Sequence, residues 1–231
     1  MIIEIDNMVI LSKRLEMVAS LVPEGCNCAD IGADHGYLIS YLVENNIVSK
    51  AYACENKIGP FSRLEENLRD YNLLDKIEID LSDGISSLPS SYNTVIIAGM
   101  GGDTVVKILT DSLNKLVNID HFIISSHTKM YEVRKFLIEL GYYIEEEKCC
   151  FEEKQFYQVS KFSRGTKNYS ELNLKYGPKL IENKDITLLK ELERTHFNNN
   201  YIASLDFIPQ RKKEQFYHKN KEIEQIIEML K

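Results

Sequence analysis

The sequence predicts an α/β fold, in which a mostly parallel sheet is covered by helices and is followed by a C-terminal helical hairpin. Three observations support this prediction. Short apolar stretches alternate with helical patterns through residues 1–164. The first predicted strand ends in a glycine-bearing turn directly before a helix, as ligand-binding βα units do. After residue 164 the hydrophobic spacing becomes that of long helices rich in Lys and Glu.

The first half of the sheet is predicted from residues 12–81. An apolar face predicts a helix over residues 12–21, which Pro23 and Gly25 end. Strands are expected over residues 26–31, 50–54 and 77–81, the last because apolar and acidic residues alternate there. Helices are expected over residues 36–46 and 59–68, so strands and helices alternate as in a parallel sheet.

The second half of the sheet is predicted from residues 94–162. Residues 94–98 are an unbroken apolar run, as expected of a central parallel strand that is buried on both faces. Helices are expected over residues 103–117 and 129–140, with a strand over 121–125 between them. Residues 142–151 and 155–162 read as two strands joined by Glu152-Glu153-Lys154, a hairpin that adds one antiparallel strand to the sheet.

The predicted tail, residues 165–231, reads as two long helices joined by a turn. Pro209 lies near the bend between two apolar stripes. The first stripe contains Ile186, Leu189 and Leu192, and the second contains Ile223, Ile226, Ile227 and Leu230. Their spacing near 3.5 residues predicts an antiparallel, coiled-coil-like helical hairpin.

Composition and charge limit the classes of function. The chain has 231 residues, 44% hydrophobic and 27% charged, with a net charge of −7. Residues 1–160 carry 14 Lys or Arg and 25 Asp or Glu, a balance of −11, whereas residues 161–231 carry 14 and 10, a balance of +4. A basic tail on an acidic body indicates an anionic partner.

Localisation is predicted from features that are missing. No apolar run approaches the roughly 18 residues of a membrane span, and residues 1–5 are too short and too acidic for a signal peptide. The five cysteines are odd in number and form no C-x-x-C pair, which indicates neither a disulfide framework nor a zinc site. We therefore expect a cytoplasmic protein with no membrane partner and no metal.

Candidate ligand-binding residues lie where predicted strands end. Asp30 lies at the end of the first strand and Gly32 follows it, where the glycine allows a sharp turn and the carboxylate favours a cationic ligand. On its own this turn also fits an Asp that merely caps the next helix. Glu55 ends the second strand, where an acid can accept both hydroxyls of a ribose. Asp83-Gly84 follows the third strand and could bind an adenine amine, or could be a simple turn.

The fourth strand ends in Gly99-Met100-Gly101-Gly102. One glycine would serve a turn, but three in four residues indicate a backbone held close to a ligand. Lys13 and Arg14 stand at the start of the first helix, where cations oppose the helix dipole. They are either a solvated pair or face the substrate.

These motifs together resemble a known family. Leu11-Ser-Lys-Arg-Leu15, Asp30-Ile-Gly-Ala-Asp-His-Gly-Tyr-Leu38, Glu55 with Gly59-Pro60-Phe61, and Ile97-Ala-Gly-Met-Gly-Gly102 are similar to bacterial tRNA adenine-22 N1-methyltransferases. Lys175-Tyr-Gly-Pro-Lys-Leu180 is similar to the family's entry into its C-terminal helices. Ser125-Ser126-His127 departs from the pattern, because a Pro-Asn-type loop is expected there.

The resemblance implies a Rossmann-like class I methyltransferase domain over residues 1–164 and a tRNA-binding helical hairpin over residues 165–231. It implies S-adenosyl-L-methionine as cofactor and adenosine 22 in the D-stem region of tRNA as substrate. We also expect a monomer. By motif position, the cofactor site would comprise Asp30, Gly32, Glu55, Asp83, Gly84, Ala98, Gly99 and Gly101. Asp34, His35 and Met100 would face the target base as catalytic residues. Lys13, Arg14, Arg211, Lys212 and Lys213 would bind the tRNA.

The implied reaction requires alignment of the two reactants more than it requires a general base. Adenine N1 is already a lone-pair nucleophile at neutral pH, so the enzyme must supply proximity and support for a cationic product. Asp34 suits that support. N1 lies on the base-pairing edge, so the adenine must be extruded.

Two other classes of function stay open on the sequence. A methyltransferase of the same fold could act on another RNA site or on a small molecule, although a small molecule has no need of the basic tail. A non-catalytic RNA-binding protein is the second alternative, and the retained Asp30, Glu55 and glycine turn argue against it.

Overall fold

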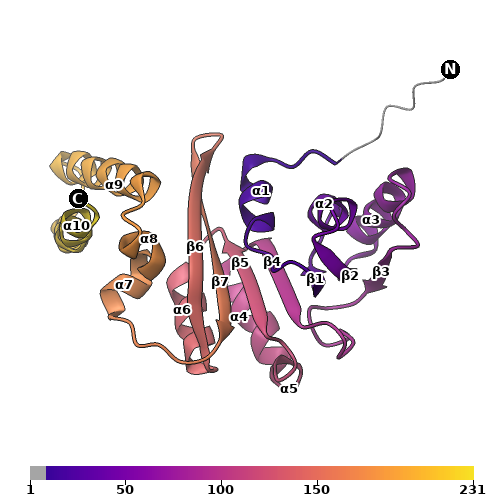
Figure 1. Cartoon of the computed structure of the whole chain (residues 1–231). Coiled ribbons are helices and arrows are strands. Elements are labelled where there is room, and N and C mark those ends of the chain that lie inside the picture. The colour runs from indigo at the N-terminus through magenta and orange to yellow at the C-terminus, as the bar shows by residue number, and fades with distance from the viewer. Residues whose placement is uncertain (1–8) are drawn as a thin grey trace.

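The computed structural model describes residues 9–231, and a seven-stranded sheet forms its centre (Figure 1). The strands are β1 (Cys26–Ile31), β2 (Val48–Glu55), β3 (Ile77–Leu81), β4 (Thr94–Met100), β5 (His121–Ser126), β6 (Tyr142–Glu152) and β7 (Gln155–Arg164). Their order is β3-β2-β1-β4-β5-β7-β6, and β7 is the one strand that runs opposite to the other six. The predicted parallel sheet with one antiparallel strand is confirmed. Residues 1–5, on which the signal-peptide expectation rests, lie outside the described residues.

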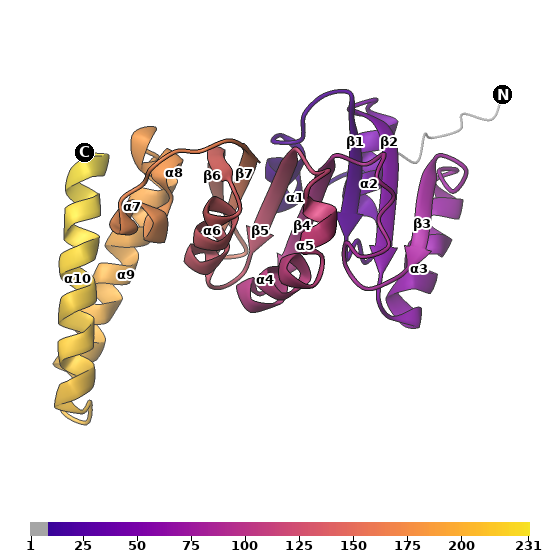
Figure 2. The same cartoon turned by 90° about the horizontal axis from the view of Figure 1, so that it is seen from below.

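Helices cover both faces of the sheet (Figures 1 and 2). Side chains of α1 (Lys13–Ala19), α2 (Tyr37–Glu44) and α3 (Ile58–Asp70) pack against one face. Side chains of α4 (Gly102–Asp111), α5 (Leu113–Leu116) and α6 (Met130–Glu139) pack against the other. Successive residues of the strands alternate between the two cores, as Cys28 and Ala29 of β1 do. The result is a three-layer α/β domain.

One predicted helix is broken. Residues 103–117 were expected to form a single helix, but α4 ends at Asp111 and α5 begins at Leu113. Ser112 leaves the helical region at φ −124° and its N–H bonds to the carbonyl of Leu109. Serine side and main chains compete well with helix geometry, so a kink at this residue is physically reasonable.

The tail contains two short helices before the predicted hairpin. These are α7 (Glu171–Tyr176) and α8 (Pro178–Glu182), followed by α9 (Ile186–Ser204) and α10 (Gln210–Leu230). The apolar seam of the hairpin contains Leu188, Leu192, Ile223, Ile226 and Leu230. Ile186, expected in the first stripe, is 59% exposed, because Leu188 occupies the buried position instead.

A buried ion pair joins the tail to the sheet. Arg134 of α6 donates to Glu147 of β6 at 2.8 Å, and neither side chain is exposed. The same guanidinium donates to the Leu174 carbonyl of α7 at 3.0 Å, and Glu147 accepts the backbone N–H of Lys179 at 2.9 Å. Since both charges depend on groups of the tail for their hydrogen bonds, this network fixes where α7 and α8 dock.

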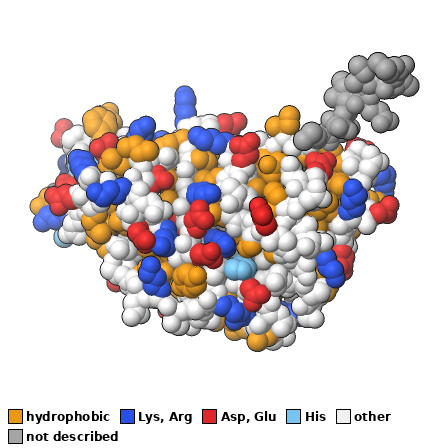
Figure 3. All heavy atoms as spheres, viewed as in Figure 1, with side chains coloured by type: hydrophobic (Ala, Val, Ile, Leu, Met, Phe, Trp, Pro, Cys, Tyr) orange, Lys and Arg blue, Asp and Glu red, His pale blue; other side chains and the backbone are white. Residues whose placement is uncertain are grey.

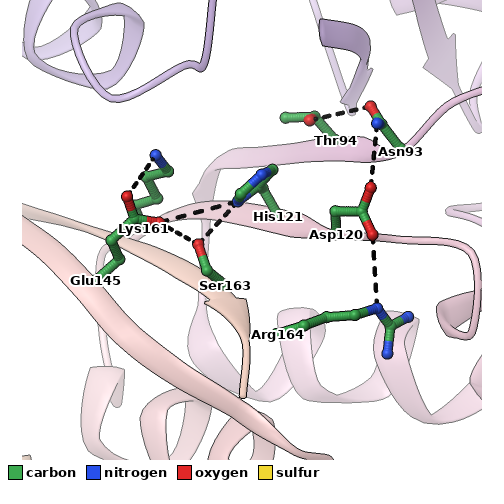
Figure 4. Close-up of polar contacts among 8 residues, drawn as sticks. All are labelled: Asn93, Thr94, Asp120, His121, Glu145, Lys161, Ser163 and Arg164. Carbon is green, nitrogen blue, oxygen red and sulfur yellow. Dashed lines mark hydrogen bonds and ion pairs between the residues drawn. The ribbon is translucent and has the colours of Figure 1, made fainter.

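A cluster of polar side chains connects neighbouring strands at the end of the sheet where β4 and β5 begin (Figure 4). His121 lies 2.8 Å from the Ser163 hydroxyl, which donates to Glu145. Burial and the nearby Lys161 lower the pKa of His121. These contacts link β5, β6 and β7 at the amino-terminal end of β5. We assign the cluster a structural role.

Within residues 9–231, none of the helices combines the length and the apolar character that crossing a lipid bilayer requires. Charged side chains of both signs are spread over the face of the molecule that Figure 3 shows.

Candidate active site

Two adjoining pockets open at the carboxyl ends of β1, β2 and β4. The larger has a volume of about 400 Å³ and the smaller of about 220 Å³. Gly32 and Met100 line both, so the pockets meet at these two residues. A parallel α/β sheet binds ligands at this edge, where adjacent strands end side by side.

The turn after β1 forms the floor between the pockets. Gly32 has φ 74°, and its N–H bonds to the Cys54 carbonyl at 2.9 Å. A Cβ at this position would overlap the terminal methyl group of Met100. Only glycine therefore allows the Met100 side chain to lie over this turn.

Two buried carboxylates stand on either side of this turn. Asp30 is 4% exposed and lines the larger pocket, and Glu55 is 8% exposed and lines the smaller one. Burial, and secondarily the charge of Glu55, raises the pKa of Asp30 to about 7. Such a carboxyl favours a ligand that brings a positive charge into the pocket.

Glu55 also holds the loop that follows Gly32. Its Oε1 accepts the backbone N–H of Asp34 at 2.5 Å. Asp83 and Gly84 lie in the same smaller pocket, and Asn56 donates to the Asp83 carboxylate at 3.1 Å. The structure therefore brings the acids that follow β2 and β3 together in one pocket.

Seven residues of the smaller pocket were not predicted from the sequence. They are Ile31, Cys54, Asn56, Ser82, Thr104, Lys107 and Ile108. Three of them, Thr104, Lys107 and Ile108, lie on α4, which follows the glycine-rich turn directly. In the sequence, the only signal for these three residues was their helical spacing after Gly102. The fold was needed to show that they line the same pocket as Glu55.

Asp34 and His35 line the larger pocket near its mouth. Asp34 has φ 48°, and its carboxylate lies 3.2 Å from Arg63 and 3.9 Å from His35. The Asp34 side chain is 58% exposed, and the His35 ring stacks on Tyr37 at 5.3 Å. Both side chains are therefore accessible to a substrate that enters from solvent.

Some residues of the glycine-rich turn at the end of β4 line the larger pocket, whereas Gly101 has a structural role. Ala98, Gly99 and Met100 line the larger pocket. Gly101 lines neither pocket, because it is the N-cap of α4 and faces Thr128. The structure thus places all the residues expected at the cofactor in the two pockets, apart from Gly101.

A cationic wall, formed by Arg14 and His127 with Tyr157 packed against them, lies beside Gly99 in the larger pocket. The Arg14 guanidinium lies 5.5 Å from the centre of the Tyr157 ring, and His127 packs edge-on against that ring at 5.8 Å. Among the described residues, the buried Arg14 Nη1 has no hydrogen-bond partner. Gly99 lies close to both Arg14 Nη1 and His127 Nε2. A buried guanidinium nitrogen without a partner suits an oxygen-rich or nitrogen-rich ligand.

The loop at residues 125–127 supports this wall. Ser125 donates to the carbonyl of Gln158 at 3.0 Å, and Ser126 donates to that of Met100 at 3.0 Å. The backbone N–H of His127 also bonds to the Met100 carbonyl at 3.1 Å. Both serines are buried, so this departure from the family's pattern anchors the end of β4 and exposes only His127 to the pocket.

The remaining basic candidates lie outside the pockets. Lys13 is exposed beside Arg14 on the first turn of α1. Residues 211–213 lie at the far end of the tail, on the first turn of α10. Within residues 9–231, no group of three His, Cys, Asp or Glu side chains could hold a metal ion.

Comparisons with known proteins agree with this geometry. A family model described as a methyltransferase domain matches residues 11–160. The tRNA (adenine(22)-N(1))-methyltransferase of Bacillus subtilis (strain 168) is 30% identical over 96% of this chain and 95% of that protein.

Two solved structures are similar over nearly their whole length. A candidate tRNA (m1A22) methyltransferase of Streptococcus pneumoniae in complex with S-adenosyl-L-methionine has a TM-score of 0.87 at 26% identity, over 94% of this chain and 100% of that one. TrmK of M. capricolum in complex with S-adenosyl-homocysteine has a TM-score of 0.85 at 28% identity, over 96% of this chain and 99% of that one.

Proposed function

This chain belongs to the family of tRNA (adenine(22)-N(1))-methyltransferases, and we propose that it transfers a methyl group from S-adenosyl-L-methionine to N1 of adenosine 22 in tRNA. The observation that carries this proposal is the pair of joined pockets, with the buried Asp30 and Glu55 on either side of the Gly32 turn.

The residues present fit S-adenosyl-L-methionine. The cofactor is elongated, with a cationic sulfonium between an adenosine and an amino-acid end, and the two pockets form an elongated site that narrows at Gly32 and Met100. Glu55 would hold the ribose hydroxyls, and Asp83 with Gly84 would border the adenine. Asp30 would face the cationic half. Met100 is unbranched, so its side chain can turn away from Gly32 at small cost.

The bound cofactor supplies an electrophilic methyl group, and the chain's own residues supply alignment. Adenine N1 needs no deprotonation, so none of these side chains has to act as a general base. The Gly99 backbone lets the flat base approach, because no Cβ stands in its way. Asp34 offers a carboxylate near the base as it becomes cationic, which stabilises the charge that develops. Its neighbour Arg63 holds that carboxylate in place.

The cationic wall is the proposed contact for the flipped nucleotide. A positive charge directly at N1 would oppose a cationic product, so Arg14 suits the nucleotide's phosphate or sugar oxygens better than the reacting edge. His127 lines the larger pocket and offers its ring to the base, and Tyr157 packs against both Arg14 and His127 and positions them. We assign Arg14 and His127 to substrate binding, together with the exposed Lys13.

The tail is the proposed tRNA-binding part. Residues 1–164 carry the site and residues 165–231 would contact the RNA backbone through their positive surface, including residues 211–213. The acidic body repels a phosphate backbone, so productive binding needs positive charge elsewhere. We further propose that the enzyme acts as a cytoplasmic monomer without a metal ion.

The experiment that tests this function measures transfer of a labelled methyl group from S-adenosyl-L-methionine. Purified chain is mixed with unmodified tRNA that carries adenosine at position 22, or with the same tRNA carrying guanosine there. We expect label in the first RNA and background in the second. Equal labelling of both would assign the activity to another site.

A further inference from the structure

The far end of the tail has a surface of its own. We infer that this surface, the hairpin tip of residues 197–221, stacks against unpaired nucleobases of the bound RNA. The inference rests on the proposed function for its RNA, and it adds a contact to bases where the tail's charge alone would explain only contacts to phosphates. It is carried by four observations: exposed aromatic rings, a pocket beside one of them, local charge, and reach.

Four large aromatic side chains of the hairpin tip face solvent. Their exposures are 71% for Phe197, 62% for Tyr201, 78% for Phe207 and 60% for Tyr217. Among residues 9–231, Tyr37 is the one other exposed Phe or Tyr, and at 39% it is much less exposed than these four. None of the four belongs to the apolar seam of the hairpin. They therefore add little to the stability of the fold and form an apolar surface available to a partner.

A pocket of about 420 Å³ lies beside one of these rings. Tyr217 and Lys213 line it, one helical turn apart on α10, and Ala203 of α9 forms part of the opposite side. The Lys221 ammonium lies 4.7 Å from the centre of the Tyr217 ring. A ring flanked by lysines is the arrangement on which single-stranded nucleic acids stack, with the cations serving the backbone.

The charge of the tip selects an anionic partner. Residues 197–221 contain five Lys or Arg and two Asp or Glu, a balance of +3. The basic residues are Arg211, Lys212, Lys213, Lys219 and Lys221. In a tip-to-tip contact, a second copy of this chain would bring the same positive charge and be repelled, whereas RNA offers both phosphates and flat bases.

The hairpin that carries the tip lies beside the catalytic edge of the sheet. Arg194 of α9 donates to the carbonyl of Lys154 in the β6–β7 turn at 3.2 Å. That turn lies at the edge of the site, because Glu152 beside it accepts the backbone N–H of Arg14 at 3.1 Å. From Arg194, α9 runs ten residues further to Ser204, roughly 15 Å at the helical rise. Figure 2 shows the far ends of α9 and α10 extending beyond the rest of the molecule. An RNA that lies across the site therefore extends toward the tip.

The test uses the absence of tryptophan from the chain. Phe207→Trp and Tyr217→Trp, made separately in the full chain, each introduce a single tryptophan whose emission is quenched when a nucleobase stacks on it. Val117→Trp is the matched control, because Val117 is 70% exposed but lies on the body after α5. We expect unmodified tRNA and oligo(rU) to quench both tip variants, and a blunt RNA duplex without unpaired bases to leave them bright. Val117→Trp should stay bright with all three RNAs.

Affinity gives a second readout. Replacing Tyr201 and Tyr217 with leucine keeps apolar bulk but removes the rings, and should weaken tRNA binding about 5- to 100-fold with an unchanged salt slope. Replacing both with phenylalanine should preserve binding. Wild-type affinity in the leucine variant, or no quenching in either tip variant while each still methylates tRNA, would overturn the inference and leave the proposed function intact.

Two further outcomes separate the remaining cases. Tip emission that changes with protein concentration in the absence of RNA would mean self-association and would also overturn the inference. Base-dependent quenching in a chain that does not methylate tRNA would instead support the tip as an RNA contact and remove the proposed function.

Discussion

At the scale of single residues, Asp30 links the site to pH. Because burial raises its pKa to about 7, the carboxyl is largely protonated below neutral pH in the protein without cofactor. A cationic cofactor favours the ionised form, so we expect affinity for S-adenosyl-L-methionine to rise about tenfold from about pH 6 to about pH 8. Calorimetric titration across this range checks the prediction. Asp30→Asn should flatten the curve, and a wild-type affinity independent of pH would contradict it.

The same group affects folding with a definite sign. Its folded-state pKa lies above the unfolded value of 3.8, so its stabilising contribution is complete below about pH 4 and is lost as the pH rises toward about 7. Asp30→Asn should therefore raise the melting temperature of the cofactor-free protein at about pH 8 more than at about pH 4. The substitution that impairs cofactor binding should thus stabilise the fold, which separates the two roles of this carboxyl.

Asp34 is predicted to serve chemistry more than cofactor affinity. Its carboxylate is accessible at the mouth of the larger pocket, while its backbone N–H, which Glu55 holds, is unchanged by a side-chain substitution. Asp34→Asn should slow single-turnover methyl transfer by about 10- to 100-fold, a modest electrostatic loss, with cofactor affinity nearly unchanged. Loss of cofactor affinity together with a wild-type single-turnover rate would show that the residue has the opposite role.

The sequence predicted the residues that follow strand ends and missed those that only tertiary structure brings together. Asp30 and Glu55 lie at the carboxyl ends of β1 and β2, and Asp83 comes soon after β3, and such ends meet at one edge whatever the loops do. Tyr157 lies on the antiparallel strand, and its contact with Arg14 depends on where β7 inserts. No local pattern carries that information.

At the scale of elements, the buried Arg134–Glu147 pair decides how the tail docks. Glu147→Ala would leave a buried guanidinium without its counter-charge, and should lower the free energy of unfolding by about 3–5 kcal/mol. Chemical denaturation measures this value. Glu146→Ala, at the exposed neighbouring position, is the control and should cost less than about 1 kcal/mol. Equal effects of the two substitutions would mean that the pair does not fix the docking.

This network also limits how the tail can be tested. A deletion that begins at residue 168 would remove the Leu174 carbonyl and the Lys179 N–H from the buried pair. Loss of activity after such a cut would report on folding as well as on RNA binding. Substitutions on the exposed surface of the hairpin in the full chain avoid that ambiguity.

The boundaries of an element were predicted correctly where a local sequence pattern defines them. Strand β3 matches its predicted residues, since alternation and a following turn define it. One residue of the expected α9 stripe was wrong, because Ile186 and Leu188 are both apolar and only the packing of α9 against α10 and β6 decides which is buried. A buried hydrogen bond of 2.8 Å, which Asn199 donates to Asn220, fixes the pairing of α9 with α10. The amino-acid composition did not predict this bond.

At the scale of the whole molecule, charge is divided between an acidic body and a basic tail. Replacing residues 211–213 with alanine should weaken tRNA binding and flatten its salt dependence, by up to about one unit of slope for each phosphate that the variant no longer neutralises. Binding titrations at several salt concentrations measure the slope. Alanine at Lys50, Lys76 and Lys135, exposed residues of the body, is the matched control. An unchanged slope would place the RNA on Lys13, Arg14 or another face of the body.

The position of the new methyl group in the tRNA is the most direct measure of the proposed function. A methyl group on adenine N1 blocks base pairing, so reverse transcriptase stops beside the modified nucleotide. Unmodified tRNA is incubated with the purified chain and S-adenosyl-L-methionine and then copied by primer extension. We expect one new stop, next to adenosine 22, that needs both enzyme and cofactor. Labelled tRNA without that stop, or with a stop at a different nucleotide, would contradict the assignment of adenosine 22 as the target.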